Sequence, residues 1–298
     1  MSADAHTERT TRAGGPELVS IVVPSFNQAR WLGACLESLF AQGDPNLEVI
    51  VVDGGSTDGT RSVLDAWRPR LSACISERDE GHAHALEKGF AIARGAIQAW
   101  LNSDDLHMPW TIARWREAFA RDPRLEMVHG DRIVIDADGR VTGYRLLPGH
   151  SRYWLNRFPW THQETAAWRR TLYDRVGGID RSLRFAMDFD LFARFFEQGR
   201  CAHLRSFLGA FRWHGDSKSA RIQATVGAAD MRLVRARLGV ASHPRLSPLR
   251  VAMGLAVRAR TRLHTLAPHR PPERPTRTGL HVSELWPPEL REPVRRLW

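Results

Sequence analysis

Apolar residues along this chain fall into two patterns, short continuous runs and stretches with helical spacing. Continuous runs are typical of strands in a parallel sheet that is covered on both faces. They predict four buried strands, at residues 18–24, 47–53, 71–76 and 96–101. Between the first two runs, apolar residues recur on one face of a helix, namely Leu32, Cys35, Leu36, Leu39 and Phe40. The order strand, helix, strand predicts a right-handed βαβ unit.

The rest of the chain combines helical spacing with signs of antiparallel pairing. Helical spacing predicts helices at residues 81–93 and 109–120, a later one that carries Leu191 and Phe192, and another beyond Gln223. Strands are expected at residues 125–129, 132–135, 141–146 and 205–213, with a hairpin turn at residues 136–139. We therefore expect an α/β fold with a central mixed, mostly parallel sheet flanked by helices.

Composition divides the chain into three parts. Residues 1–17 are polar and lack the apolar core of a signal peptide, so we expect a disordered leader. Residues 18–240 form the predicted domain. Residues 241–298 are rich in arginine and contain nine of the 17 prolines, which predicts a partly disordered tail. Within it, residues 249–263 alternate arginine with apolar residues. That piece is expected either to lie on an anionic membrane or to pack as an ordinary helix.

Charge and cysteine content bear on partners and compartment. The net charge is +10, of which the tail alone holds +7. A basic chain invites a nucleic-acid partner, but no readout motif is present in residues 18–240, so we expect none. No apolar run approaches the roughly 18 residues of a membrane-spanning helix. Cys35, Cys74 and Cys201 follow no metal-ligand spacing, and an odd count fits a reducing cytoplasm. The expected location is the cytoplasm, with membrane association left open.

Two adjacent carboxylates, Asp104 and Asp105, follow directly on a buried apolar run. Neighbouring anions at the end of a buried strand repel each other and are costly to desolvate unless a positive group lies beside them. Mg²⁺ and Mn²⁺ prefer oxygen ligands and complete their coordination with water and substrate phosphates. The pair therefore predicts a cation site for a phosphorylated substrate. A helix N-cap before Pro109 is the alternative.

Further polar residues follow the other predicted strands. Asp53 ends the second strand and precedes two glycines, at the sheet edge where α/β proteins bind ligands, so it is placed to accept hydrogen bonds from a nucleobase or ribose. Asp79 lies at the start of a helix whose N-terminus favours anions. No dinucleotide-binding or Walker motif is present. Asp188 and Asp190 lie at the start of a later helix, where capping and function are equally open.

The order of these motifs resembles family 2 of the inverting nucleotide-sugar glycosyltransferases, which have the GT-A fold. The resemblance covers residues 19 to 220. It is carried by Ile21-Val22-Val23-Pro24-Ser25-Phe26-Asn27, Val51-Val52-Asp53-Gly54-Gly55-Ser56-Thr57-Asp58-Gly59-Thr60, Leu101-Asn102-Ser103-Asp104-Asp105, Asp180, Asp188-Phe189-Asp190-Leu191 and His214. One departure concerns Gly54, because the family often has a second aspartate at this place.

The resemblance implies roles for particular residues. Asp105 is expected to bind a divalent Mn or Mg ion, His214 to reach the metal or the diphosphate, and Asp188 to act as catalytic base. The residues expected to bind the donor are Pro24, Ser25, Asn27, Asp53, Asp79, Lys88 and Asp104, with Asp104 near the ribose or the donor sugar.

The implied activity is metal-dependent inverting transfer of a sugar from a UDP-, GDP- or dTDP-sugar to a hydroxyl of a saccharide or lipid-linked acceptor. Biosynthesis of cell-surface polysaccharide or glycoconjugate is the expected setting. A catalytically inactive nucleotide-sugar-binding homologue that acts as a scaffold is the alternative.

Overall fold

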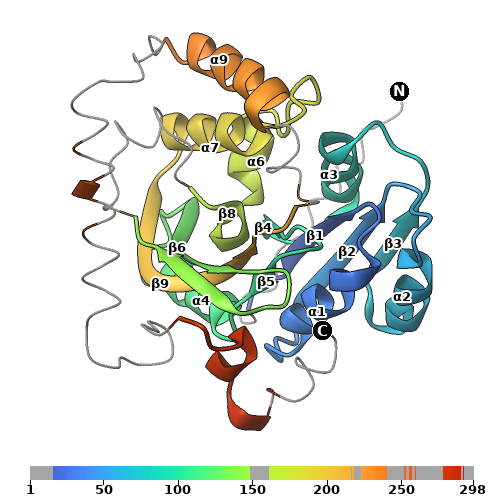
Figure 1. Cartoon of the computed structure of the whole chain (residues 1–298). Coiled ribbons are helices and arrows are strands. Elements are labelled where there is room, and N and C mark those ends of the chain that lie inside the picture. Colours follow the sequence, from blue (N-terminus) through green and yellow to red (C-terminus); the bar gives the residue numbers. More distant parts are fainter. Residues whose placement is uncertain are drawn as a thin grey trace, which may run out of the picture.

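The computed structural model describes residues 16–147, 161–215, 217, 223–239, 278–289 and 291, with the single positions 252, 255, 256 and 259. These residues build one mixed sheet with helices on both faces (Figure 1). Its strands are β1 (Val19–Ser25), β2 (Leu47–Asp53), β3 (Ala73–Ser76), β4 (Ile97–Trp100), β5 (Leu106–His107), β6 (Met127–Ile135), β7 (Val141–Arg145), β8 (Ala167–Arg169) and β9 (Cys201–Arg212).

Helices connect these strands. The α-helices are α1 (Ala29–Phe40), α2 (Thr60–Trp67), α3 (His82–Ile92), α4 (Thr111–Arg121), α6 (Arg170–Arg175), α7 (Met187–Gln198) and α9 (Ala228–Arg237). Short helical turns are η1 (Arg68–Arg70), η2 (Gln163–Thr165), η3 (Gln223–Gly227) and η4 (Val282–Leu285).

The strand order brings many strand ends to one edge of the sheet. The order is β3-β2-β1-β4-β8-β6-β9-β5, and β7 pairs with β6. β1 is parallel to β2 and β4, while β8 is antiparallel to both β4 and β6. β6 therefore runs in the same direction as β4, and β9 is parallel to β6. The carboxyl ends of β1, β2, β4 and β9 consequently lie at the same edge, where ligands bind in α/β sheets.

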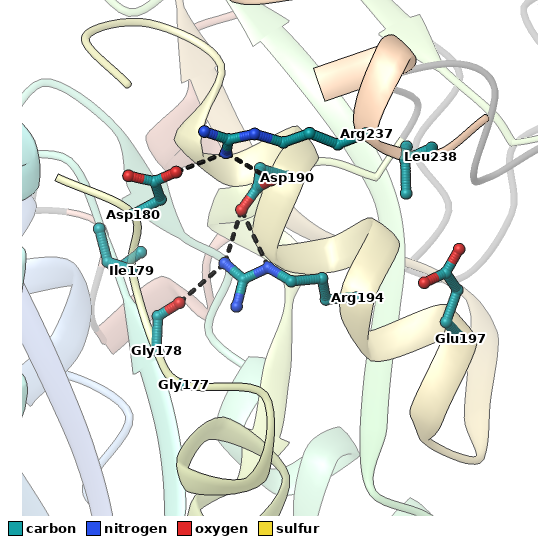
Figure 2. Close-up of a pocket in the computed structure, with 9 residues that line it drawn as sticks. All are labelled: Gly177, Gly178, Ile179, Asp180, Asp190, Arg194, Glu197, Arg237 and Leu238. Carbon is teal, nitrogen blue, oxygen red and sulfur yellow. Dashed lines mark hydrogen bonds and ion pairs between the residues drawn. The ribbon is translucent and has the colours of Figure 1, made fainter. Parts of the chain in front are cut away.

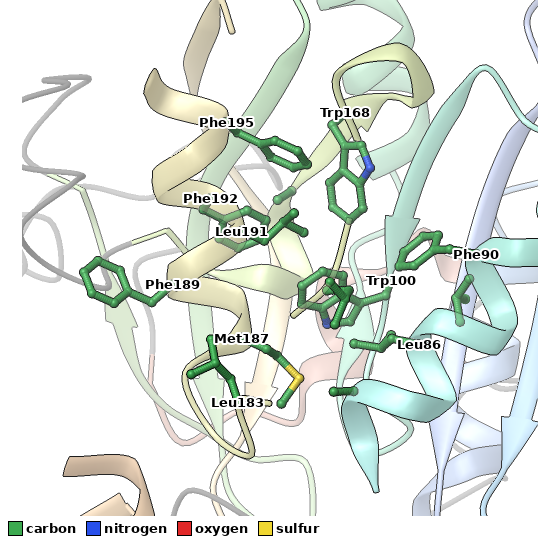
Figure 3. Packing of buried hydrophobic residues seen from close by; sticks show 14 of the residues in the cluster. Leu86, Phe90, Trp100, Trp168, Leu183, Met187, Phe189, Leu191, Phe192 and Phe195 are labelled. Atoms are coloured by element: carbon green, nitrogen blue, oxygen red, sulfur yellow. The ribbon is translucent and has the colours of Figure 1, made fainter. Parts of the chain in front are cut away.

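Two apolar layers cover the sheet. One contains residues of α1, α2 and α4, and the other contains residues of α3, α6 and α7. Figure 3 shows the second layer, in which aromatic residues of α7 pack against Trp100 and Trp168. Phe192 stacks on Trp100 with ring centroids 5.7 Å apart and an interplanar angle of 10°. This aromatic contact fixes α7 over β4 and β8, the strands at the centre of the sheet.

The predicted fold class and the βαβ unit are confirmed. β2 has the predicted bounds, and β1, β3, β4 and the first helices differ from the expectation by a few residues at most. The strands expected at 125–129 and 132–135 are one strand, β6, whose pairing with β9 shifts register at Gly130 and Asp131. A side chain at Gly130 would meet Leu208 and the Ser206 carbonyl within 2.7 Å, so glycine permits this close approach of β9.

One described segment of the tail packs on the domain. Residues 278–286 pack on the β6–β7 hairpin, where Val141 N–H donates to the Leu280 carbonyl and Gly279 N–H donates to the Val141 carbonyl. Val282 and Trp286 are buried. This segment, red at the bottom of Figure 1, is ordered, and the expectation that the tail is partly disordered stays a prediction. The leader and most of the amphipathic piece at 249–263 lie outside the described residues. In the described part of the chain, no helix has the length and apolar character needed to cross a membrane.

Candidate active site

The ends of β1 and β2 bring the first predicted donor-binding residues together. Buried Pro24 precedes Ser25, which lies opposite Asp53 in the parallel pairing. Asn27 follows with a left-handed φ of 54° and is exposed. Its N–H donates to Ser56 Oγ at 2.7 Å, and its Oδ1 accepts from the N–H of the residue after Ser56 at 2.9 Å. The turn after β1 is thereby fixed to the loop after β2.

Asp53 is fully buried and already has several hydrogen-bond donors. Its oxygens accept from Ser56 Oγ, from Ser56 N–H at 3.1 Å and from Ser76 Oγ at 2.8 Å. A carboxylate offers about four lone-pair positions, so at most one remains for a ligand. Asp53 therefore shapes the loop after β2, and its predicted contact with a nucleobase stays a prediction.

Asp79 lies directly over Gly54. A Cβ added to Gly54 would lie 2.8 Å from Asp79 Oδ2 and 3.1 Å from its carboxyl carbon. The other oxygen, Oδ1, accepts from the Gly81 N–H at 2.7 Å. The resemblance implied one carboxylate fewer at this edge, because Gly54 stands where the family often has aspartate. The structure shows that a carboxylate from the next loop occupies the adjoining space.

Lys88 lies on α3 behind this loop. Its Nζ is 2.6 Å from Glu77 Oε1, and its side chain is largely buried. Lys88 lowers the pKa of the Glu77 carboxyl by hydrogen bonding and by its charge. This pairing keeps a cation close to the end of β3, while its predicted contact with the donor stays a prediction.

Asp104 and His214 meet although 110 residues separate them in sequence. His214 Nε2 lies 3.0 Å from Asp104 Oδ2, and both side chains are mostly buried. Asp104 follows β4 and His214 follows β9, so the contact joins two strand ends at the ligand-binding edge. The predicted metal ligand His214 thus lies against Asp104 rather than against Asp105, the expected direct ligand.

Asp105 is enclosed by hydrogen-bond donors. Its Oδ2 accepts from Gln163 Nε2 at 2.9 Å and its Oδ1 from the Arg212 N–H at 2.9 Å. Burial, followed by the charges of Asp104 and Glu164, raises the pKa of the Asp105 carboxyl well above its usual range. Asp105 therefore ties β4 to β9 and η2 from inside the protein, and its assignment as a metal ligand stays untested.

Arg212 links the same edge to the β6–β7 turn. Its Nε donates to the Asp104 carbonyl at 2.7 Å, and one terminal nitrogen donates to the carbonyls of Asp136 and Ala137. Burial lowers the pKa of the Arg212 guanidinium to about 10, although Asp105 and Asp104 oppose this effect. Because this guanidinium is tied to main-chain carbonyls on two segments, it fixes the backbone of the carboxylate motif.

Asp188 lies in the first turn of α7 and is half-buried. Just before α7, Arg181 forms ion pairs with Glu80, which precedes α3, and with Glu87 in the middle of α3. Figure 3 shows Met187, the first residue of α7, beside Leu86 of α3. The start of α7, with the predicted catalytic base Asp188, therefore packs beside α3, the helix that starts at the edge of the sheet where the predicted metal and donor residues lie.

Asp190 belongs to a separate ion-pair network. It binds Arg194 one turn later in α7 at 2.6 Å, while Arg237 of α9 lies 2.5 Å from Asp180 and 3.7 Å from Asp190 (Figure 2). These residues line a cavity of about 460 Å³ between α7, α9 and the loop before α7. Asp180, Asp190, Arg194 and Arg237 pair with one another at its wall, and these ion pairs favour a structural role for Asp190.

Sequence reasoning missed Gln163 and Arg212 as parts of this site, and also Trp31, whose ring centroid lies 4.0 Å from that of His214. Gln163 lies in η2, just before β8. β8 has only three residues, which pair with β4 on one side and β6 on the other, and a strand this short shows no apolar periodicity. Arg212 had one available signal. It stands two residues before His214 at the end of a predicted strand, and positions two apart in extended backbone point to the same side. Trp31 was indistinguishable from a core residue of an amphipathic helix.

Within the part of the chain that the structure describes, no group of three or more His, Cys, Asp or Glu side chains is arranged to hold a metal ion. Asp104 and His214 supply two donors of the right chemistry, an oxygen and an imidazole nitrogen. A bound Mg²⁺ usually takes only one or two protein carboxylates and completes its coordination with substrate phosphates and water. A two-residue site is therefore compatible with a cation that arrives with a diphosphate.

Solved structures share this fold. The complex of S. aureus TarS residues 1–349 with UDP-GlcNAc is 20% identical, covers 76% of this chain and 68% of that chain, and has a TM-score of 0.62. The mannosyltransferase PcManGT from Pyrobaculum calidifontis, in complex with GDP-Man and Mn²⁺, is 23% identical, covers 85% and 71%, and has a TM-score of 0.58. At these identities the likeness shows the fold, which is GT-A.

Sequence relatives agree with the fold. Chondroitin synthase of Escherichia coli is 29% identical over 213 residues, which is 68% of this chain and 30% of the relative. A PGL/p-HBAD biosynthesis glycosyltransferase of Mycobacterium bovis is 28% identical over 186 residues, or 60% and 70%. The chain spans less than a third of the length of the synthases it matches. The family described as Glycosyl transferase family 2 matches residues 20–180, more than half of the sequence, and this chain belongs to that family.

Proposed function

We propose that this protein is a metal-dependent inverting glycosyltransferase. It moves a sugar from a nucleoside-diphosphate sugar to a hydroxyl of a saccharide or lipid-linked acceptor. The observation that carries the proposal is the contact between Asp104 and His214 at the edge of the sheet that also holds Asp53, Asp79 and the start of α7. Two potential cation ligands that are far apart in the sequence thus meet at the edge of the sheet where the residues proposed to bind the nucleotide lie.

The spacing of these two ligands suits a cation. Two ligands at right angles, each about 2.1 Å from an octahedral Mg²⁺, are about 3.0 Å apart. His214 Nε2 and Asp104 Oδ2 have that separation, 3.0 Å. We therefore assign Asp104, rather than Asp105, as the direct carboxylate ligand, and Asp105 as the residue that holds the motif in place. Mn²⁺ and Mg²⁺ both fit this oxygen and nitrogen pair.

Donor chemistry is inferred from the structural neighbours. These neighbours were solved in complex with UDP-GlcNAc, with UDP, and with GDP-Man and Mn²⁺. In this chain Asn27, Asp53 and Asp79 surround the ends of β1 and β2 with polar groups. We assign that cluster, together with Pro24, Ser25 and Lys88, to the nucleoside. A uridine, guanosine or thymidine donor remains compatible with these residues.

The transfer itself is a single displacement. Asp188 accepts the proton of the acceptor hydroxyl as that oxygen bonds to the anomeric carbon. The bond from the anomeric carbon to the diphosphate oxygen breaks at the same time, and the nucleoside diphosphate leaves with the electron pair. Asp104 and His214 would hold a divalent cation, which when bound would supply Lewis-acid neutralisation of the charge on the leaving group. Attack opposite the leaving group inverts the anomeric configuration without an enzyme nucleophile.

The relatives support only a general biological setting for the reaction. Synthases and a biosynthetic glycosyltransferase among them support polysaccharide or glycoconjugate assembly as the setting. We place the reaction in the cytoplasm, and propose that the arginine-rich tail contacts an anionic membrane when the acceptor is lipid-linked. Liposome flotation of the chain with and without residues 241–298 tests the tail, and equal flotation would discard the membrane contact.

A thermal-shift and hydrolysis experiment tests the activity. Purified protein is heated with UDP, GDP or dTDP, each with Mn²⁺, Mg²⁺ or a chelator. We expect one nucleotide to raise the melting temperature only with a cation, and Asp104→Ala to abolish that rise. The matching UDP-, GDP- or dTDP-sugars are then screened for slow hydrolysis. Protection without hydrolysis or transfer would favour the inactive scaffold, and protection that is insensitive to chelator would refute the cation site.

A further inference from the structure

The imidazole of His214 rests on the indole of Trp31. Their ring centroids are 4.0 Å apart with an interplanar angle of 44°. Trp31 lies in the first turn of α1, and both side chains are buried. Neither α1 nor Trp31 belongs to the strands that carry the carboxylate motif. The contact therefore brings a third segment of the chain to the Asp104–His214 pair.

His214 lacks the hydrogen bond that ordinarily orients a metal-binding histidine. In such sites the second ring nitrogen usually donates to a carboxylate or carbonyl, which fixes the tautomer and the ring orientation. Nδ1 of His214 is buried and has no hydrogen-bond partner among the described residues. The ring is consequently fixed by Asp104 at Nε2 and by contact with Trp31 on its face.

Trp31 itself is anchored at both ends. Its backbone is part of α1, and its Nε1–H donates to the Ala137 carbonyl at 3.1 Å. Ala137 lies in the β6–β7 turn, whose carbonyls also accept from Arg212. The guanidinium of Arg30 lies over the indole, 5.2 Å from its centroid, and forms an ion pair with Asp138. Trp31 is therefore a rigid surface for the histidine ring.

The turn that anchors Trp31 is held from outside by the C-terminal segment. Val282 N–H donates to the Gly139 carbonyl at 2.8 Å, and His281 pairs with Arg140 as an isolated bridge. A chain of contacts thus runs from the C-terminal segment through the turn and Trp31 to His214. Each member is ordered by the next, which favours one orientation of the imidazole.

We propose that Trp31 is a positioning residue of the transfer centre, one that holds the His214 ring by a close, tilted ring contact so that Nε2 faces a cation shared with Asp104. This inference rests on the proposed function. A ring that is already oriented loses no rotational freedom when the cation binds, so loss of the ring contact should weaken cation binding more than it weakens folding.

Manganese binding measured by electron paramagnetic resonance tests the proposal without relying on turnover. Free Mn²⁺ is titrated with the full chain in the presence of UDP or GDP, whichever stabilises the protein. Trp31→Leu removes the ring, and Trp31→Phe keeps an aromatic face but loses the hydrogen bond to Ala137. Trp67→Leu is the matched control, because Trp67 stacks on Phe40 in the layer of α1 and α2 with ring centroids 5.7 Å apart. Melting temperatures of the metal-free proteins are recorded for all four chains.

We expect Trp31→Leu to weaken Mn²⁺ binding about tenfold or more, Trp31→Phe to weaken it less than Trp31→Leu, and Trp67→Leu to leave it within about twofold of the unsubstituted chain. If Trp31→Leu does not fold, an intermediate loss in Trp31→Phe carries the proposal. Equal Mn²⁺ affinity in the unsubstituted chain and the Trp31 variants would overturn it, as would an equal loss in Trp67→Leu. If the unsubstituted chain binds no Mn²⁺ with either nucleotide, the proposed function fails first.

Discussion

The carboxylate of Asp79 lies in the space in which a side chain at Gly54 would begin. An ideal Cβ on Gly54 would be 2.8 Å from Asp79 Oδ2, although the two residues belong to different loops. Gly54 N–H also donates to the Ser25 carbonyl, so this backbone has little room to retreat. The absence of a side chain at position 54 and the presence of a carboxylate at position 79 are thus two parts of one arrangement.

Substitution of Gly54 by alanine is expected to displace Asp79. Non-bonded atoms essentially never lie within 3.0 Å of a Cβ, so the carboxylate of Asp79 has to shift away from position 54. We expect Gly54→Ala to weaken binding of the preferred nucleoside diphosphate about tenfold, measured by isothermal titration with Mn²⁺. Asp79→Ala should have a similar effect. The double variant should lose less than the sum of the two, because residues in contact are not additive. Strict additivity would show that the two positions act independently.

Asp104 and Asp105 are expected to respond differently to the same substitution. Asp104→Asn should weaken Mn²⁺ binding strongly, because it removes the anionic ligand. Asp105→Asn places an amide against Gln163 and the Arg212 N–H, two donors, and should destabilise the fold by about 1–3 kcal/mol. Urea unfolding and Mn²⁺ titration of both variants separate the roles. The assignment is reversed if Asp105→Asn loses the cation while Asp104→Asn keeps it.

The strand ends that form this site were readable from the sequence because their polarity changes abruptly. Asp53 and Asp104 each follow a buried apolar run, and the sheet brings such ends to one edge. His214 was found through the resemblance, since a lone histidine after a strand carries no physical signal. Which of the two carboxylates it would share a cation with stays a prediction. Asp105 accepts from the Arg212 N–H and Asp104 lies against His214, and the sequence does not encode these separate contacts.

Other parts depended on contacts that local patterns do not specify. β8 has three residues and lies between β4 and β6 because both neighbours offer backbone hydrogen bonds. Propensity over three residues decides little against such tertiary pairing. The ordered segment of the tail was not predicted separately, because prolines and arginines dominate the composition of the tail. Val282 nevertheless packs in the apolar cluster that includes residues of β6 and β7.

Acid is expected to destabilise the fold through His107. Burial lowers the pKa of this imidazole to about 3, from an ordinary value near 6.5. Between these values the unfolded chain binds the proton and the folded chain does not, so stability falls as the pH drops from 6.5 towards 3. At pH 5 the loss is about 2 kcal/mol. Urea unfolding at pH 7 and pH 5 should show it, and His107→Leu should flatten the difference. If the free energy of unfolding of His107→Leu falls by as much between pH 7 and pH 5 as that of the unsubstituted chain, His107 is not the source of the loss.

Trp286 is expected to contribute to the stability of the whole domain. Its side chain is 1% exposed, and its neighbours Val282 and Leu285 pack in the cluster that includes residues of β6, β7 and α1. Trp286→Ala should cost about 3–5 kcal/mol, as is typical for a buried tryptophan. Leu255→Ala is the control, because Leu255 is 57% exposed and its loss should stay within about 0.5 kcal/mol. Equal urea midpoints for the two variants would show that the segment does not dock in solution.

Asp188 and Asp190 offer a direct contrast within one helical turn. Asp188→Asn should lower kcat about 10²–10⁴-fold, the usual contribution of a general base, while the affinity for donor and Mn²⁺ stays within about twofold. Asp190→Asn should instead lower stability, because Asp190 is paired with Arg194 and lies near Arg237, and it should keep most of the turnover. The two substitutions have the same chemistry and the same helix, so the comparison controls for both. If Asp190→Asn abolished transfer while Asp188→Asn remained active at saturating acceptor, the base would have to be reassigned. The ion pairs of Asp190 with Arg194 and Arg237 would then serve catalysis rather than the stability of the fold.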